Sequence, residues 1–206
     1  MSDVKIRRLV LAALFAALCT VMTMVVQIPS PMQGYVNLGD CAVLLSAWVL
    51  GPLYGGAAAG IGSMLADLLS GYAHYAPGTL VIKFGMALAA ALIFRAVRRR
   101  GPGWLPAAQA ASSLASGVIL VGGYFGYACL WLGKGLAAAS SIPGNVVQAV
   151  FGLIAAALVY GALARGYIST RPPTLALPAS SCGSKVRSEP QLPRSLQPNS
   201  DRKSVV

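Results

Sequence analysis

Long apolar runs, separated by short breaks that contain glycine, proline or charge, dominate the first 165 residues of the chain. Runs of about 18 or more apolar residues are long enough to cross a membrane hydrocarbon core roughly 30 Å thick. We expect six such spans, each bounded by breaker or charged residues. The expected ranges are 9–26, 38–54, 55–70, 79–97, 106–132 and 145–164. The pattern predicts an all-α, polytopic membrane protein with six transmembrane helices.

Composition agrees with this class, because 56% of the residues are hydrophobic and only 10% are charged. These fractions are far from those of a soluble domain. An alternative for the first span is a secretory signal, which also places a basic segment before an apolar run. The run is longer than a usual signal core and ends in no clear small-x-small cleavage site. We therefore expect the first span to stay in the protein.

Basic residues cluster beside the first, fourth and sixth spans. They are Lys5, Arg7, Arg8, Arg98, Arg99, Arg100, Arg165 and Arg171. With six spans all three clusters fall on one side, and short cytoplasmic segments are the ones enriched in Lys and Arg. Both termini are then cytoplasmic. This topology also accounts for most of the net charge of +11, which forms no single basic face for nucleic acid.

The chain divides into a six-helix transmembrane substrate-binding domain, residues 1–170, and a polar tail, residues 171–206. The tail is basic, rich in proline and serine and poor in large apolar residues, so we expect a disordered cytoplasmic segment. The four cysteines are widely separated, without the two- to four-residue spacing of a metal site. The sequence therefore indicates no metal, no cofactor and no disulfide.

Polar residues gather at one level of the expected bundle, near its outer face. They are Asn37, Asp40, Asp67, His74, Tyr75, Lys83, Tyr124, Asn145 and Gln148. A charge inside a transmembrane helix costs about 2.5 to 3.5 kcal/mol, so Asp40, Asp67 and Lys83 are expected to face a polar cavity or each other. The inner halves of the spans carry almost no ionisable side chains. A solute-binding site open to the outside is the simplest explanation.

Each of these residues also has a purely structural interpretation. Asp40 is placed to cap the second helix, and Asp67 and Lys83 are placed to form a buried pair between neighbouring spans. Asn145 and Gln148 share a helical face, where amides also hold helices together. A loop histidine is most often just solvated. Their common depth is what favours a joint site.

Small residues recur at four-residue spacing in two of the spans. In the third span the run 55–63 is almost entirely glycine, alanine and serine, which lets helices approach closely. In the first span Ala12 pairs with Ala16, and Ala13 pairs with Ala17. This face of the first span is available to another helix, either inside the bundle or in a partner.

Several segments together resemble the substrate-binding S components of energy-coupling factor (ECF) transporters. They are Asn-Leu-Gly-Asp at 37–40, Gly-Pro-Leu-Tyr-Gly at 51–55, Asp-Leu-Leu-Ser-Gly-Tyr at 67–72, Tyr-Ala-Pro-Gly-Thr at 75–79 with Lys83, and Pro-Gly-Asn at 143–145 with Gln148. The closest likeness is to the riboflavin-type branch, which also includes proteins assigned to pyridoxine or hydroxymethylpyrimidine. The resemblance covers roughly the first 165 residues.

The resemblance implies a six-helix bundle in the cell membrane that captures a vitamin from outside. It also implies partners, namely a transmembrane T subunit and two cytoplasmic ATPase subunits, with the alanine pairs of the first helix in contact with the T subunit. That role falls on Ala12, Ala13, Ala16 and Ala17. The chain has no Gly-x-x-x-x-Gly-Lys-Ser/Thr phosphate loop, so we expect a transport subunit and not an enzyme.

In the corresponding mechanism the solute passes beneath the loop of His74 and Tyr75 and stacks on Tyr75 or Tyr124. The amides and Asp40 form hydrogen bonds with it, and Lys83 meets an anionic edge or neutralises Asp67. Two other classes compete. An integral membrane enzyme using Asp40 and Asp67 needs a tighter cluster of catalytic groups. A structural or channel-forming bundle needs polar residues along a continuous path, which the inner halves lack.

Overall fold

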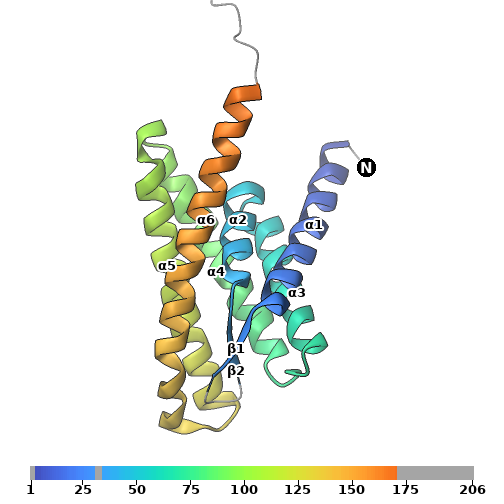
Figure 1. Cartoon of the computed structure of the whole chain (residues 1–206), viewed down its shortest axis with the longest axis vertical. Helices are drawn as coiled ribbons and strands as arrows, with labels where there is room; N and C mark the ends of the chain where they lie inside the picture. Colours follow the sequence, from blue (N-terminus) through green and yellow to red (C-terminus); the bar gives the residue numbers. More distant parts are fainter. Residues whose placement is uncertain (1–2, 31–33, 171–206) are drawn as a thin grey trace, which may run out of the picture. The chain divides into compact units, whose positions relative to one another are not determined.

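The computed structural model describes residues 3–30 and 34–170, and six α-helices make up most of this part of the chain (Figure 1). The helices are α1 (Asp3–Val25), α2 (Gly39–Leu50), α3 (Pro52–Leu69), α4 (Ala76–Arg98), α5 (Leu105–Gly126) and α6 (Ile142–Thr170). Three short helical turns join them, namely η1 (Pro102–Trp104), η2 (Tyr127–Trp131) and η3 (Gly135–Ser141). The expected tail, 171–206, lies outside the described residues.

Within the described part, four helical stretches are long and apolar enough to cross a membrane. They are Lys5–Val25, Ala76–Arg98, Pro102–Trp131 and Gly135–Ala164. Helix α2 is too short to be one of them, because its 12 residues extend only about 18 Å along the helix axis. Helix α3 has 18 residues and is not among these stretches. The helical membrane class predicted from the sequence is therefore confirmed.

Helices α2 and α3 meet at a sharp turn at Gly51, and not after Tyr54 as the sequence suggested. Gly51 has a φ of +85°, a region that side chains with a Cβ rarely adopt. A Cβ there would also lie 1.8 Å from the guanidinium of Arg95. Pro52 then begins α3 at the first helical position, where a missing N–H costs nothing. The turn thus lies beside the carboxyl end of α4.

The expectation of an all-α fold is incomplete, because an antiparallel β-hairpin joins α1 to α2. Strand β1 (Gln27–Ser30) pairs with β2 (Gly34–Asn37), and Gln27 lies opposite Asn37. The prolines of this connection prevent it from continuing α1. The hairpin carries the chain to the start of α2 and brings polar side chains of β2 to that end of the bundle.

Helix α2 lies at the centre of the bundle, and ten of its 12 residues are buried. It contacts α1, α3 and α4. Near its carboxyl end the ring of Trp48 stacks on Phe94 at 5.4 Å and meets the edge of Tyr160 at 5.6 Å. The indole N–H of Trp48 donates to Ser112 Oγ at 3.0 Å. One aromatic cluster therefore joins α2 to α4, α5 and α6.

Large apolar side chains cover the outward faces of the surrounding helices. Leu14 on α1, Leu114 on α5 and Leu158 on α6 are all exposed. Monomeric soluble proteins rarely expose continuous apolar surface on this scale. The surface is that of a protein whose solvent is lipid, with the backbone polar groups satisfied inside the helices.

The glycines of α3 permit the close packing that the small-residue pattern predicts. A Cβ on Gly62 would lie 2.3 Å from the backbone oxygen of Ala16, and one on Gly55 would lie 2.6 Å from the backbone oxygen of Ser46. The hydroxyl of Thr20 donates to the carbonyl of Gly62 at 2.8 Å. Helices α1 and α3 therefore touch through their backbones.

We predict that Gly62→Ala lowers the free energy of unfolding by about 1 to 3 kcal/mol, because the added methyl group forces α1 and α3 apart. The matched control is Gly122→Ala in α5, where a Cβ meets nothing within 4 Å. Thermal unfolding of the two variants in detergent measures the difference. Equal stability of both variants would contradict the close contact at Gly62.

Candidate functional site

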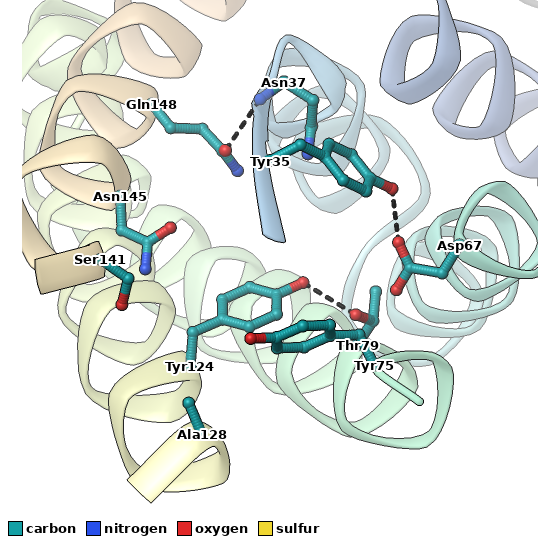
Figure 2. A pocket seen from close by; sticks show the side chains of 10 residues that line it. All are labelled: Tyr35, Asn37, Asp67, Tyr75, Thr79, Tyr124, Ala128, Ser141, Asn145 and Gln148. Atoms are coloured by element: carbon teal, nitrogen blue, oxygen red, sulfur yellow. Dashed lines mark hydrogen bonds between the residues drawn. The ribbon is translucent and has the colours of Figure 1, made fainter. Parts of the chain in front are cut away.

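A polar cavity lies at the end of the bundle that carries the hairpin, the turn between α3 and α4, and the connection between α5 and α6 (Figures 1 and 2). Tyrosines, amides, hydroxyls and one carboxylate line it, together with one alanine. The lining residues are Tyr35, Asn37, Asp67, Tyr75, Thr79, Tyr124, Ala128, Ser141, Asn145 and Gln148. Strand β2 and helices α3, α5 and α6 contribute, together with the start of α4 and the connection between α5 and α6.

The cavity gathers six of the nine residues that the sequence placed at one depth. They are Asn37, Asp67, Tyr75, Tyr124, Asn145 and Gln148. Asp40 and Lys83 are buried but are not among the lining residues, and His74 is exposed in the turn between α3 and α4. The sequence missed four lining residues. Tyr35 belongs to the hairpin, and Thr79, Ala128 and Ser141 carry no charge that would mark them in an apolar helix.

Asp40 and Lys83 form an ion pair in the interior, and each is only 2% exposed. The sequence suggested Asp67 as a partner for Lys83, and this pairing is wrong. Asp40 lies in the first turn of α2, after the N-cap residue Leu38, where the helix dipole favours a negative charge. Lys83 reaches it from α4, which crosses α2 at this level.

Gln148 connects the ion pair to the wall of the cavity. Its Nε2 donates to Asp40 Oδ2 at 2.9 Å. Its Oε1 accepts the backbone N–H of Asn37 at 2.9 Å (Figure 2). Gly152, one turn further along α6, lies against Asp40 and lets the two helices approach. Because one atom must donate and the other must accept, these two bonds leave one orientation for the Gln148 amide.

Asp67 lies on the other side of the cavity and has a different environment. It is 4% exposed, and the hydroxyl of Tyr35 donates to its Oδ1 (Figure 2). Burial, and then the hydrogen bond to Asp67, raise the pKa of Tyr35 well above its usual value. The phenol therefore stays protonated and remains a donor at physiological pH.

Tyr75, just before α4, and Tyr124 of α5 form one wall of the cavity. Thr79 Oγ1 and the Tyr124 hydroxyl lie 3.0 Å apart, at hydrogen-bond distance, and the rings of Tyr75 and Tyr124 lie 6.4 Å apart (Figure 2). At the rim, Lys134 Nζ donates to the Tyr75 hydroxyl at 3.1 Å. These contacts hold the ring faces in place, an arrangement suited to a flat solute.

An apolar helical bundle with a polar, aromatic cavity near one end has the architecture of a membrane-embedded protein that captures a small molecule. The family model of the ECF-type riboflavin transporter S component matches residues 3–165. The chain therefore belongs to this family. It is a multi-pass membrane protein and a vitamin-capture subunit of an ECF transporter, and the alternative of a membrane enzyme is wrong because the family's members are transport subunits.

Two further comparisons agree with this membership. The chain is 38% identical over 136 residues to a protein of Pyrococcus woesei described as an uncharacterized protein in a gap 3' region, and the match covers 66% of this chain and 86% of the relative. A solved structure of the S component of a bacterial ECF transporter superposes with a TM-score of 0.59 at 20% identity. That match covers 81% of this chain and 99% of the other and shows a shared fold.

We predict that Lys83→Met lowers the free energy of unfolding by about 3 to 5 kcal/mol, because it leaves the Asp40 carboxylate buried without its counter-charge. The double variant Asp40→Asn with Lys83→Met removes both charges and is expected to lose clearly less. Unfolding in mixed detergent micelles measures each variant. A double variant that is less stable than Lys83→Met would show that the pair is not the reason for the loss.

Proposed function

We propose that this protein binds a small heterocyclic vitamin or precursor from outside the cell, with pyridoxine, hydroxymethylpyrimidine and riboflavin as the candidates. A transmembrane T subunit and two cytoplasmic ATPases would supply the energy for release inside. The observation that supports this proposal most directly is the cavity itself, where amides, hydroxyls and one carboxylate surround tyrosine rings. A few placed polar groups in an aromatic pocket are how small-molecule sites usually gain specificity.

The proposed topology has six spans in the cell membrane, with both termini in the cytoplasm. The basic residues Lys5, Arg7 and Arg8 lie at the start of α1, and Arg98 lies at the end of α4. The start of α1 and the end of α6 lie at the upper end of the bundle in Figure 1, opposite the hairpin. By the excess of Lys and Arg on cytoplasmic flanks, the cavity then faces outward.

Helices α2 and α3 would serve as the second and third spans despite their modest length. The hairpin continues the second span towards the outer surface, and a bilayer adapts to a short helix at a cost of fractions of a kcal/mol per Å. Chain direction supports this arrangement. The α2–α3 turn lies beside Arg95, near the carboxyl end of α4. Helix α4 begins beside the cavity and ends near this turn. The turn therefore lies at the end of the bundle opposite the cavity.

In the proposed complex the solute ring lies against Tyr75 and Tyr124, and the amides of Asn145 and Gln148 form hydrogen bonds with its polar edges. Asp40 and Lys83 act through Gln148 and do not touch the solute, because neither lines the cavity. They are therefore positioning residues.

The alanine pairs of α1 divide between two roles. Ala12 is buried and Ala16 packs against Gly62 of α3, so both belong to the bundle interior. Ala13 and Ala17 are exposed. We propose that the face formed by Ala13 and Ala17 contacts the T subunit, since small side chains allow a partner helix to approach closely.

We predict that the purified protein binds at least one of pyridoxine, hydroxymethylpyrimidine and riboflavin, and that Asn145→Ala weakens this binding about tenfold by removing one buried hydrogen-bonding group. Mass spectrometry of small molecules released from the detergent-solubilised protein names the solute, and titration calorimetry measures affinity. Ser140→Ala is the control, because this exposed hydroxyl bonds only to the carbonyl of Ala137 among the described residues. A protein that releases nothing and ignores all three vitamins would contradict the proposal.

We predict that Ala17→Trp abolishes co-purification with the T subunit and the ATPases while vitamin affinity stays within about twofold, because a bulky ring prevents close helix contact. Leu158→Trp, on the exposed face of α6, is the control and should leave assembly intact. Affinity capture of the co-expressed complex measures both variants. Loss of assembly in the control alone would place the partner on α6.

A further inference from the structure

One carboxylate oxygen in the cavity has no protein partner. Asp67 Oδ2 is buried and forms no hydrogen bond with any residue in the described part of the chain. The other oxygen, Oδ1, accepts the hydroxyl of Tyr35. Buried polar atoms are almost always hydrogen-bonded, and a buried charged oxygen without a partner is costly. Asp67 therefore lines the cavity with an unused acceptor.

The two nearby lysines are engaged with other groups, whereas the hydroxyl of Thr79 also lies close to Asp67. Lys83 pairs with Asp40, and its Nζ lies 5.6 Å from the centroid of the Tyr124 ring. The hydroxyl of Thr79 lies at hydrogen-bond distance from Tyr124, and Lys134 donates to Tyr75 at the rim. None of the ten lining residues is basic. The lining thus holds one acidic side chain and no basic one.

We propose that Asp67 determines the substrate class by accepting an N–H donor from the solute, so that the site takes heterocycles bearing an amino group. This inference rests on the proposed function of vitamin capture. A hydrogen bond to an ionised carboxylate is shorter and stronger than one between neutral groups. A cationic or amino edge both satisfies Oδ2 and offsets its charge, whereas a carboxylate or phosphate on the solute is repelled.

This assignment separates the candidate vitamins. An aminopyrimidine presents an exocyclic amine that can reach Asp67 while its ring lies against the tyrosines. An analogue with a methyl group in place of the amine has nearly the same shape but leaves Oδ2 unpaired. A site built to bind a polar group discriminates strongly against the analogue that lacks it.

The test compares 4-amino-5-hydroxymethyl-2-methylpyrimidine with its 4-methyl analogue on the full chain in detergent, by titration calorimetry, with pyridoxine and riboflavin as the remaining panel. We expect the amine to bind about ten- to a hundredfold more tightly than the methyl analogue. Binding of any panel vitamin without this amine preference would overturn the inference and leave the proposed function standing. Failure of every vitamin to bind would overturn both.

Asp67→Asn provides a second measurement. Tyr35 donates to Oδ1, so the variant keeps its amide oxygen on Tyr35 and turns its NH2 towards the cavity, where it opposes a donor on the solute. The amine preference should therefore disappear. Ser140→Ala, which lies outside the cavity lining, keeps the carboxylate and Tyr35 in place and should keep the preference. Thermal unfolding shows whether each variant is folded, and an amine preference that persists in folded Asp67→Asn would overturn the inference.

Discussion

The buried ion pair between Asp40 and Lys83 is the interaction on which the rest of the structure depends. Taking two charges out of water costs several kcal/mol per ion, and the pair is tolerable only with good geometry and further hydrogen bonds. Gln148 supplies one of these bonds to Asp40, and the amino end of α2 supplies a favourable dipole. The requirement to satisfy one carboxylate thus aligns α2, α4 and α6 at a single level.

The hairpin and the cavity are built outward from this pair. Gln148 also accepts the N–H of Asn37, so β2 is attached to α6 at the point where α2 begins. The carboxylates of Asp40 and Asp67 differ in their hydrogen-bond and charge partners. Asp40 is paired by a lysine and an amide, whereas Asp67 is held only through one oxygen by Tyr35. The first stabilises the bundle, and the second leaves an acceptor facing the cavity. In the proposed site, one of these carboxylates serves structure and the other serves recognition.

The sequence predicted the helices well because a membrane allows little else. Apolar runs of this length must form helices to satisfy their backbone groups in lipid, and the helix ends differ from expectation by one to six residues. The hairpin was missed because its prolines and short strands read only as a break between spans. The common depth of the polar residues was also predictable. Six of the nine residues placed there line the cavity.

The sequence by itself determined the class of protein, the helices and the depth of the polar groups. The reason is that hydrophobicity and charge decide how deep each residue lies in the membrane. Only the tertiary structure decided which polar groups meet. Sequence position sets the height of a side chain but not which way it points around the bundle, and that angle depends on helix packing. For this reason Lys83 pairs with Asp40 and not with Asp67. For the same reason Tyr35, which reads as part of a loop, joins Asp67 at the wall of the cavity.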